Sequence, residues 1–311
     1  MITRDRLMIG TTLKYSWKNL LFSSLCALAA YTLHVPLGIQ DYYIPTEVVS
    51  IFGVALAIIL AFKNGSAYSR WWEARQIWGG IINDSRNWAR QVITCLNSIP
   101  APGEEGRELQ SLIDRQIAWV YALKMRLRKI DDQAQWDKEV GPYLNKKEYT
   151  DLQKVSNPVT HLGYEQGRAI KSLLNAEEVD LFVYLEMQAT LNRLVSHQGS
   201  AERIKNTPLP MPYEYYTRAF LYLFIFMFPF AFIKVFISVN SEILIVPISV
   251  IVGWMFHQIY IFGVVLSRPF ENWNTDVALD SITRTIEIDL KEAMNEEHVP
   301  EMLQPVDGVL N

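Results

Sequence analysis

The sequence predicts an all-α integral membrane protein with four transmembrane helices per subunit and a helical cytosolic region. The clearest observation is that residues 243–267 contain no Asp, Glu, Lys or Arg, and a stretch of this length can span a bilayer with some tilt. Residues 219–239 are similarly apolar and carry one charged side chain, Lys234. In the more polar remainder, apolar residues recur at helical spacings, and the alternation typical of a strand does not appear.

The overall composition narrows the classes of function. A chain of 311 residues corresponds to one to three domains and can bury a substantial core. Its formal net charge of −4 argues against a nucleic-acid partner, which would require a basic surface. The two cysteines, Cys26 and Cys95, lack the spacing of a metal site or a disulfide framework. We therefore predict neither a metal nor a cofactor.

The first apolar run, residues 20–33, follows a basic segment. A signal peptide would also combine positive charge with an apolar stretch, but the small-residue cleavage pattern is missing after residue 34. We therefore predict a first transmembrane helix at residues 17–37. The basic residues that precede the apolar run are Arg4, Arg6, Lys14 and Lys18.

The second span is predicted to continue into a long polar helix. Residues 48–78 are apolar in their first half and charged in their second, without a proline. Together with residues 42–47 the apolar half is long enough to cross a bilayer. Joined to the helical pattern of residues 67–98, the whole helix would contain roughly fifty residues and measure ~75 Å. The preceding connector, residues 34–47, has no Lys or Arg, whereas the residues from Lys63 onward are rich in both, which predicts a cytoplasmic amino terminus.

Two stripes at four-residue spacing run along this second span. One consists of small residues, a pattern that lets transmembrane helices approach closely. The other consists of large apolar residues one position further around the helix, which could face a shared axis if several copies packed together. Such a stripe is also typical of a packed or lipid-facing surface, and spacing alone favours that simpler interpretation. The small stripe is Gly53, Ala57 and Ala61, and the large stripe is Val54, Ile58 and Phe62.

The polar part of the chain is predicted to be cytosolic and helical. Helical patterns cover residues 104–129, 146–154, 158–174 and 176–195. Prolines at 208, 210 and 212 predict an extended approach to the third span, which forms a hairpin with the fourth. The expected organisation is residues 1–65 with the first two spans, 66–212 as a cytosolic helical region, 213–267 with the last two spans, and 268–311 as a cytosolic carboxyl-terminal segment that includes a helix at 281–294.

Four motifs carry a resemblance to a known family. They are AYSRWWEAR at residues 67–75, Asn157-Pro158, ERIKNTPLP at residues 202–210, and RPFENWNTDVALD at residues 268–280. In this order and between matching spans, they resemble the bacterial branch of the bestrophin family over nearly the whole chain.

The resemblance implies a homopentameric channel with a single axial pore and a multi-pass subunit in the bacterial plasma (inner) membrane, with both termini cytoplasmic. It also implies a neck lined by three large apolar residues of the second span. Counted back from the RWW motif, these residues are Val54, Ile58 and Phe62, so the resemblance favours the pore interpretation of the large stripe. The small stripe of Gly53, Ala57 and Ala61 is then expected to pack helices around the pore. The implied partners are other copies of the chain, membrane lipid and small monovalent ions.

The resemblance leaves the conducted ion and the gating stimulus open. A resemblance to the eukaryotic bestrophins would imply an anion channel that calcium opens. The calcium would be bound by a run of acidic residues after the fourth span. Here Trp273 interrupts that run between Glu271 and Asp276, and calcium requires six to eight oxygen ligands, so we expect no calcium gating. The negative net charge of the chain slightly favours cations over chloride as the conducted ion. No motif places the second, cytosolic constriction of the family. Its distance from the proline-rich entry to the third span makes Phe182 the candidate, with Ile170 next, although a place in a helix core is the simpler interpretation of both residues.

Three other classes of protein are alternatives to the channel interpretation, namely an enzyme, a scaffold and a transporter. An enzyme would need a nucleophile, paired carboxylates or metal ligands, but the five histidines are scattered and no HxxxH, CxxC or glycine-rich phosphate loop is present. A non-conducting, membrane-anchored helical scaffold would need no pore stripe. A transporter is expected to show broken helices or inverted repeats, and the two halves of this chain do not repeat.

Overall fold

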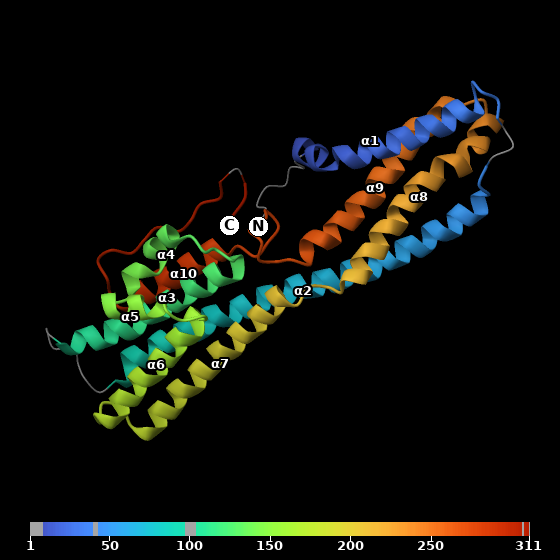
Figure 1. Cartoon of the computed structure of the whole chain (residues 1–311). Coiled ribbons are helices and arrows are strands. Elements are labelled where there is room, and N and C mark those ends of the chain that lie inside the picture. Colours follow the sequence, from blue (N-terminus) through green and yellow to red (C-terminus); the bar gives the residue numbers. More distant parts are fainter. Residues whose placement is uncertain (1–8, 40–42, 97–103, 307, 311) are drawn as a thin grey trace. The chain divides into compact units, whose positions relative to one another are not determined.

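The computed structural model describes residues 9–39, 43–96, 104–306 and 308–310, and within these ranges the secondary structure is helical apart from an isolated bridge between Val306 and Val309 (Figure 1). The predicted all-α class is therefore confirmed. The longer helices are α1 (Ile9–His34), α2 (Thr46–Cys95), α3 (Glu104–Arg128), α6 (Pro158–Asn175), α7 (Leu181–Asn206), α8 (Met211–Ser238), α9 (Ile245–Leu266) and α10 (Leu279–Ala293). The shorter ones are α4 (Gln133–Glu139), η1 (Gly141–Tyr143), α5 (Lys146–Leu152) and η2 (Glu242–Leu244).

The described residues divide into two compact units. The apolar unit contains the described residues up to Arg70 together with Pro208–Arg268. The bundle unit contains Trp71–Thr207 and the described part of Pro269–Asn311. The helix α2 contributes to both units, because it runs without interruption for 50 residues. This confirms the predicted long helix, which contains no proline to end it.

Three described helices are long and apolar enough to cross a membrane. They are α2, α8 and the segment Glu242–Leu266, which comprises η2 and α9. The helix α1, where the first span was predicted, is not among them. Polar side chains along α1, including Asn19 and Ser23, lower its hydropathy.

Three polar side chains of α1 are buried within the apolar unit, and two of them form hydrogen bonds with α9. Ser16, Asn19 and Ser23 are almost inaccessible to solvent. Ser23 donates a hydrogen bond from Oγ to the carbonyl of Ser249 at 3.0 Å, and Gln258 donates from Nε2 to Ser16 Oγ at 2.6 Å. Small residues at this interface allow two helices to approach closely and to form hydrogen bonds in an apolar environment.

The helix α8 begins earlier than the prolines predict. It starts at Met211, so Pro212 lies in its first turn, and the expectation of an extended chain through this residue is wrong. Proline is tolerated at that position because the first turn of a helix has no internal partner for the backbone N–H. Pro229 lies inside the same helix, which continues to Ser238.

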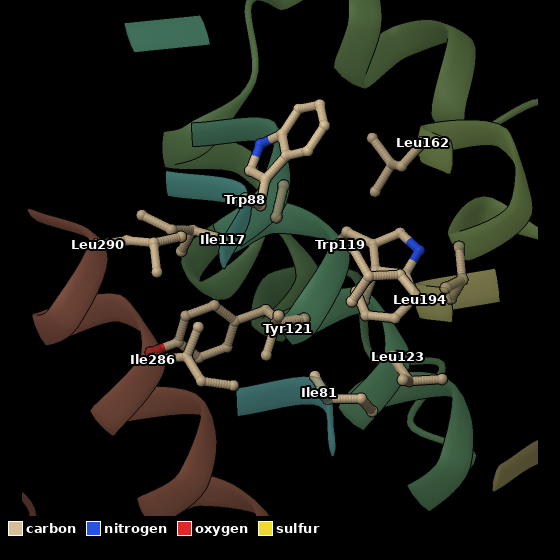
Figure 2. Close-up of a cluster of buried hydrophobic side chains, with 14 of the residues drawn as sticks. Ile81, Trp88, Ile117, Trp119, Tyr121, Leu123, Leu162, Leu194, Ile286 and Leu290 are labelled. Carbon is tan, nitrogen blue, oxygen red and sulfur yellow. The ribbon is translucent and has the colours of Figure 1, made fainter. Parts of the chain in front are cut away.

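The bundle unit is organised around α3. From Arg115 to Met125 every residue of this helix is buried, so it is covered on all sides. Ile117 and Leu123 pack with side chains from α2, α6, α7 and α10, including Trp88 of α2 (Figure 2). A helix surrounded in this way fixes its neighbours, because a closely packed core tolerates little displacement.

Hydrogen bonds and charges complete the bundle core. The carboxylate of Glu287 in α10 accepts hydrogen bonds from the hydroxyls of Tyr121 in α3 and Tyr143 in η1, at 2.6 and 2.5 Å. Lys124 of α3 pairs with Asp280 of α10 at 2.9 Å and with Glu139 of α4. These buried polar groups are paired, as burial requires.

Candidate pore-lining site

One face of α2 in the apolar unit is exposed and apolar. The side chains of Val54, Ile58 and Phe62 are 62%, 52% and 70% exposed. The opposite face is buried in the core of the unit, where Leu56 and Leu60 lie. The predicted stripe therefore lies within the part of α2 that the described helices of the apolar unit leave uncovered.

The small-residue stripe divides between two environments. A Cβ atom added to Gly53 would lie 2.9 Å from Cε2 of Phe224, so the absence of a side chain allows α8 to approach α2 within the chain. Ala57 and Ala61 are exposed instead. The small size of Gly53 thus serves packing inside the subunit, whereas the two alanines remain available for contacts with another molecule.

The exposed face of α2 carries no charge over a long distance. Between Glu47 and Arg70 the only ionisable residue with a formal charge is Lys63. Its side chain is buried, and its Nζ lies 4.0 Å from the centre of the Tyr260 ring. Between Phe62 and Arg70 the exposed residues are uncharged, namely Gly65, Ser66, Tyr68 and Ser69.

The RWW motif connects α2 to the segment that follows α9. Within the apolar unit, Arg70 donates a hydrogen bond from Nε to the carbonyl of Ser267 at 2.8 Å. Within the bundle unit, Trp71 donates from Nε1 to the carbonyl of Thr275 at 3.1 Å. Two motifs that are far apart in the sequence are therefore joined directly, each contact lying within a single unit.

In the acidic run after α9, backbone N–H groups of the segment donate hydrogen bonds to the carboxylate of Asp276. Asp276 accepts hydrogen bonds at Oδ2 from the backbone N–H groups of Glu271 and Trp273, at 2.6 and 3.1 Å. Glu271 also pairs with Lys205 at 2.8 Å. Burial raises the pKa of Asp276 to about 6, and the backbone hydrogen bonds act in the opposite direction. Among the residues that the structure describes, no group of three or more His, Cys, Asp or Glu side chains could hold a metal ion.

The two candidates for a cytosolic constriction have different surroundings. Phe182, at the start of α7, is 79% exposed, and the nearby Leu181 and Leu185 are exposed as well. Ile170 is fully buried in the core of the bundle unit, so its side chain is already covered by its own subunit. Sequence reasoning missed Leu181 and Leu185, although the four-residue spacing between them is a signal of a shared helix face.

The fold and this site define a helical membrane protein with an exposed, uncharged apolar face on a long continuous helix. Residues 6–292 match the family model described as Bacterial/Fungal Bestrophin protein. The chain therefore belongs to the bestrophin family, which confirms the resemblance predicted from the motifs.

Similar proteins occur in bacteria. In Salmonella typhimurium, a relative named voltage-dependent anion channel-forming protein YneE is 30% identical over 294 residues, covering 94% of this chain and 90% of the relative. The protein of the same name in Escherichia coli K12 is 30% identical over 302 residues, with 95% and 92% covered. The crystal structure of a bacterial bestrophin homologue from Klebsiella pneumoniae superposes with a TM-score of 0.79 at 26% identity, covering 90% of this chain and 98% of that one.

Proposed function

We propose that this protein is a passive channel for small monovalent ions, assembled as a homopentamer around one axial pore. The observation that carries the proposal is the exposed, uncharged apolar face of α2, along which Val54, Ile58 and Phe62 lie. Such a face on a membrane helix can contact lipid, another subunit or a pore. Membership of the bestrophin family and the channel names of the relatives favour the pore.

The proposed subunit crosses the bacterial inner membrane four times, with both termini in the cytoplasm. The helix α1 serves as the additional span, packed along α9 through its buried polar residues. Those residues account for its lower hydropathy, since they face a neighbouring helix and avoid lipid. Residues 66–212 and 268–311 form the cytosolic part, and residues 1–65 and 213–267 contain the four spans.

The proposed neck acts by excluding water. An apolar ring offers an ion no replacement for its hydration shell, so a narrow ring can close the pore by dewetting. Five copies of Val54, Ile58 and Phe62 would form three such rings, stacked along α2. A second constriction, in the cytosolic part, is proposed at Phe182, whose side chain is exposed. Ile170 is not proposed to line the pore, because it is buried in its own subunit.

The sign of the conducted ion follows from groups outside the neck, because the neck carries no charge. The net charge of −4 favours cations slightly, whereas the names of the curated relatives specify anions. These two indications are in tension. Charged rings along the cytosolic part of the pore would decide between them.

Reconstitution in planar bilayers under a potassium chloride gradient tests the proposal. Unitary currents with a reversal potential displaced from zero are expected, and the direction of the displacement identifies cations or anions. A non-conducting scaffold would give no current in any verified preparation. A transporter would give a flux that saturates with ion concentration and lacks unitary steps. Either result would contradict the channel proposal.

A further inference from the structure

Four charged side chains gather in the apolar unit where α8 begins and α9 ends. They are Lys63 of α2, Glu214 and Arg218 of α8, and Arg268, which follows α9. Glu214 and Arg218 lie one turn apart on α8, and the neighbouring Tyr213 donates a hydrogen bond from its hydroxyl to the carbonyl of Ile59 at 3.4 Å, one turn before Lys63 on α2. Arg268 also lies 3.9 Å from Glu214, measured between a guanidinium nitrogen and a carboxylate oxygen. We refer to these four residues as the basic cluster.

Lys63 is the unusual member of the basic cluster. The residue is 1% exposed, and its Nζ has no hydrogen-bond partner in the described part of the chain. An ammonium group can donate three hydrogen bonds, and a buried charge is costly unless it is paired. The ring of Tyr260 at 4.0 Å provides a cation–π contact, which compensates only part of that cost.

The basic cluster contains three cations and one carboxylate, so its formal charge is +2. Arg218 is exposed, and within the described residues it makes no hydrogen bond or ion pair. The side chain of Arg268 is 45% exposed, and within the described residues its one ion pair is the long contact with Glu214. The cluster therefore combines two accessible guanidinium groups with a buried ammonium group, and the single carboxylate of Glu214 does not balance their charge.

The neighbouring surface has the composition of a membrane interface. Tyr213, Tyr215 and Tyr216 are exposed on the first turns of α8. Tyrosine is enriched at the level of lipid headgroups because its ring is apolar and its hydroxyl is polar. The basic cluster thus lies at the ends of two apolar helices, beside side chains suited to the headgroup region.

We propose that the basic cluster binds the phosphate group of an anionic phospholipid. Arg218 and Arg268 contact the phosphate, since a guanidinium group forms paired hydrogen bonds with phosphate oxygens, and Lys63 adds its buried positive charge. Basic pockets at the ends of transmembrane helices are suited to such headgroups. This inference goes beyond the proposed channel, because a protein that conducted no ions would still bind lipid in this way.

Native mass spectrometry of the full-length protein in detergent provides the test. Phosphatidylglycerol and phosphatidylcholine are each titrated against the parent and the double variant Arg218→Gln/Arg268→Gln. The parent is expected to retain phosphatidylglycerol selectively, and the double variant to bind it roughly thirtyfold more weakly after losing two charges. Arg168→Gln is the matched control, because that arginine is exposed on α6 and its one ion pair among the described residues is with Glu165, one turn away. This variant should bind like the parent.

Two further variants keep the test decisive. Arg218→Gln alone replaces the test if the double variant does not assemble, because Arg218 is exposed and has no partner in the described structure. Its affinity for phosphatidylglycerol should fall roughly fivefold. Lys63→Met keeps the length of the side chain and removes its charge, and should also weaken phosphatidylglycerol binding.

Three results would overturn the proposal. One is unchanged affinity in the variants of Arg218 and Arg268. Another is equal binding of phosphatidylglycerol and phosphatidylcholine by the parent. The third is occupation of the site by inorganic phosphate that phosphatidylglycerol does not displace, because the site would then take a free anion and not a lipid.

Discussion

Phe62 and Lys63 are neighbours in the sequence, but their side chains have opposite surroundings. Phe62 is largely exposed, whereas Lys63 is buried under the ring of Tyr260. A helix separates adjacent side chains by about 100° around its axis, so one face can remain uncharged while the next residue along the chain places a cation on an adjoining, buried face. This arrangement makes the neck hypothesis testable without altering the charge of α2.

Truncation of the large stripe is the first prediction. The variant Val54→Ala/Ile58→Ala/Phe62→Ala removes apolar bulk from the proposed neck, which should widen it and make it easier to wet. Single-channel conductance or open probability is expected to rise, while the reversal potential changes little because no charge is altered. Bilayer recordings on verified pentamers measure both quantities.

The matched control removes similar side chains from other exposed positions. Leu223 and Phe226 of α8 and Ile251 of α9 are exposed apolar residues outside the stripe. Their triple replacement by Ala should leave conductance unchanged. Indistinguishable currents from the parent and the neck variant would show that the barrier lies elsewhere.

A second prediction concerns Asp276, whose pKa is raised to about 6 by burial. The unfolded chain ionises this carboxyl near pH 3.8, so between pH 4 and 6 the folded state binds more protons than the unfolded state. The contribution of Asp276 to the free energy of unfolding is therefore expected to decrease as the pH rises from 4 to 6. Above pH 6 the full cost of the buried charge remains.

The variant Asp276→Asn removes the titration and should flatten the pH dependence of the thermal midpoint between pH 4 and 6. Some slope should persist, because burial also raises the pKa of Asp114 to about 6. Asp151→Asn is a suitable control, since Asp151 is exposed and Lys154 lowers its pKa. An unaltered pH profile in Asp276→Asn would contradict the assigned pKa.

At the scale of elements, the segment after α9 combines several interactions that already engage its carboxylates. Asp276 accepts two backbone hydrogen bonds, and Glu271 pairs with Lys205. Asn272 has a positive φ of 66°, a conformation that asparagine adopts more readily than most residues. The backbone is therefore arranged around Asp276 itself.

We accordingly predict that currents do not require calcium. Binding calcium would require several oxygens from this segment, while Trp273 contributes an indole ring and Glu271 would have to leave Lys205. Open probability should be the same in a chelator and in micromolar calcium. A steep increase with calcium would show that the segment rearranges to bind it.

The sequence predicted the helices better than it predicted their ends. The length of α2 followed from the absence of proline, and the apolar runs identified α8 and α9. The start of α7 was placed too early, at residue 176, because the helical pattern does not reveal that Asp180 caps the helix by accepting hydrogen bonds from the backbone N–H groups of Phe182 and Val183. The position of Pro212 was misjudged for a related reason, since a first turn tolerates proline.

The candidate site shows a different limit of sequence reasoning. Spacing identifies residues that share a helix face, but it does not reveal what covers that face. Phe182 was predicted from its distance along the chain to the proline-rich entry of the third span, with Ile170 as the second candidate, and that distance does not reveal that Ile170 is buried while Phe182 is exposed. Gly53 shared its spacing with Ala57 and Ala61, but its close contact with Phe224 depends on how α8 packs.

At the scale of the whole molecule, the exposed apolar surface of the single chain requires partners. Large apolar residues are exposed on α2 beside Ala57 and Ala61, and others are exposed at the start of α7. Apolar patches outside the lipid-facing surface are typical of subunit interfaces. The start of α7 lies in the bundle unit, where lipid is not an available partner in the proposed topology, so another copy of the chain is the simplest cover.

The last prediction is that the purified protein is a homopentamer and that Ala57 contributes to the contact between subunits. Mass measurement in detergent should give five times the subunit mass of 35.9 kDa. Ala57→Leu places a bulky side chain on an exposed position of α2, which should separate closely packed helices and therefore weaken the pentamer or widen the neck. Ala55→Leu is the matched control, because Ala55 is exposed on the same helix outside the small stripe. A monomer or dimer in the parent would exclude the pentamer, and equal effects of the two leucine variants would remove the special role of the small stripe.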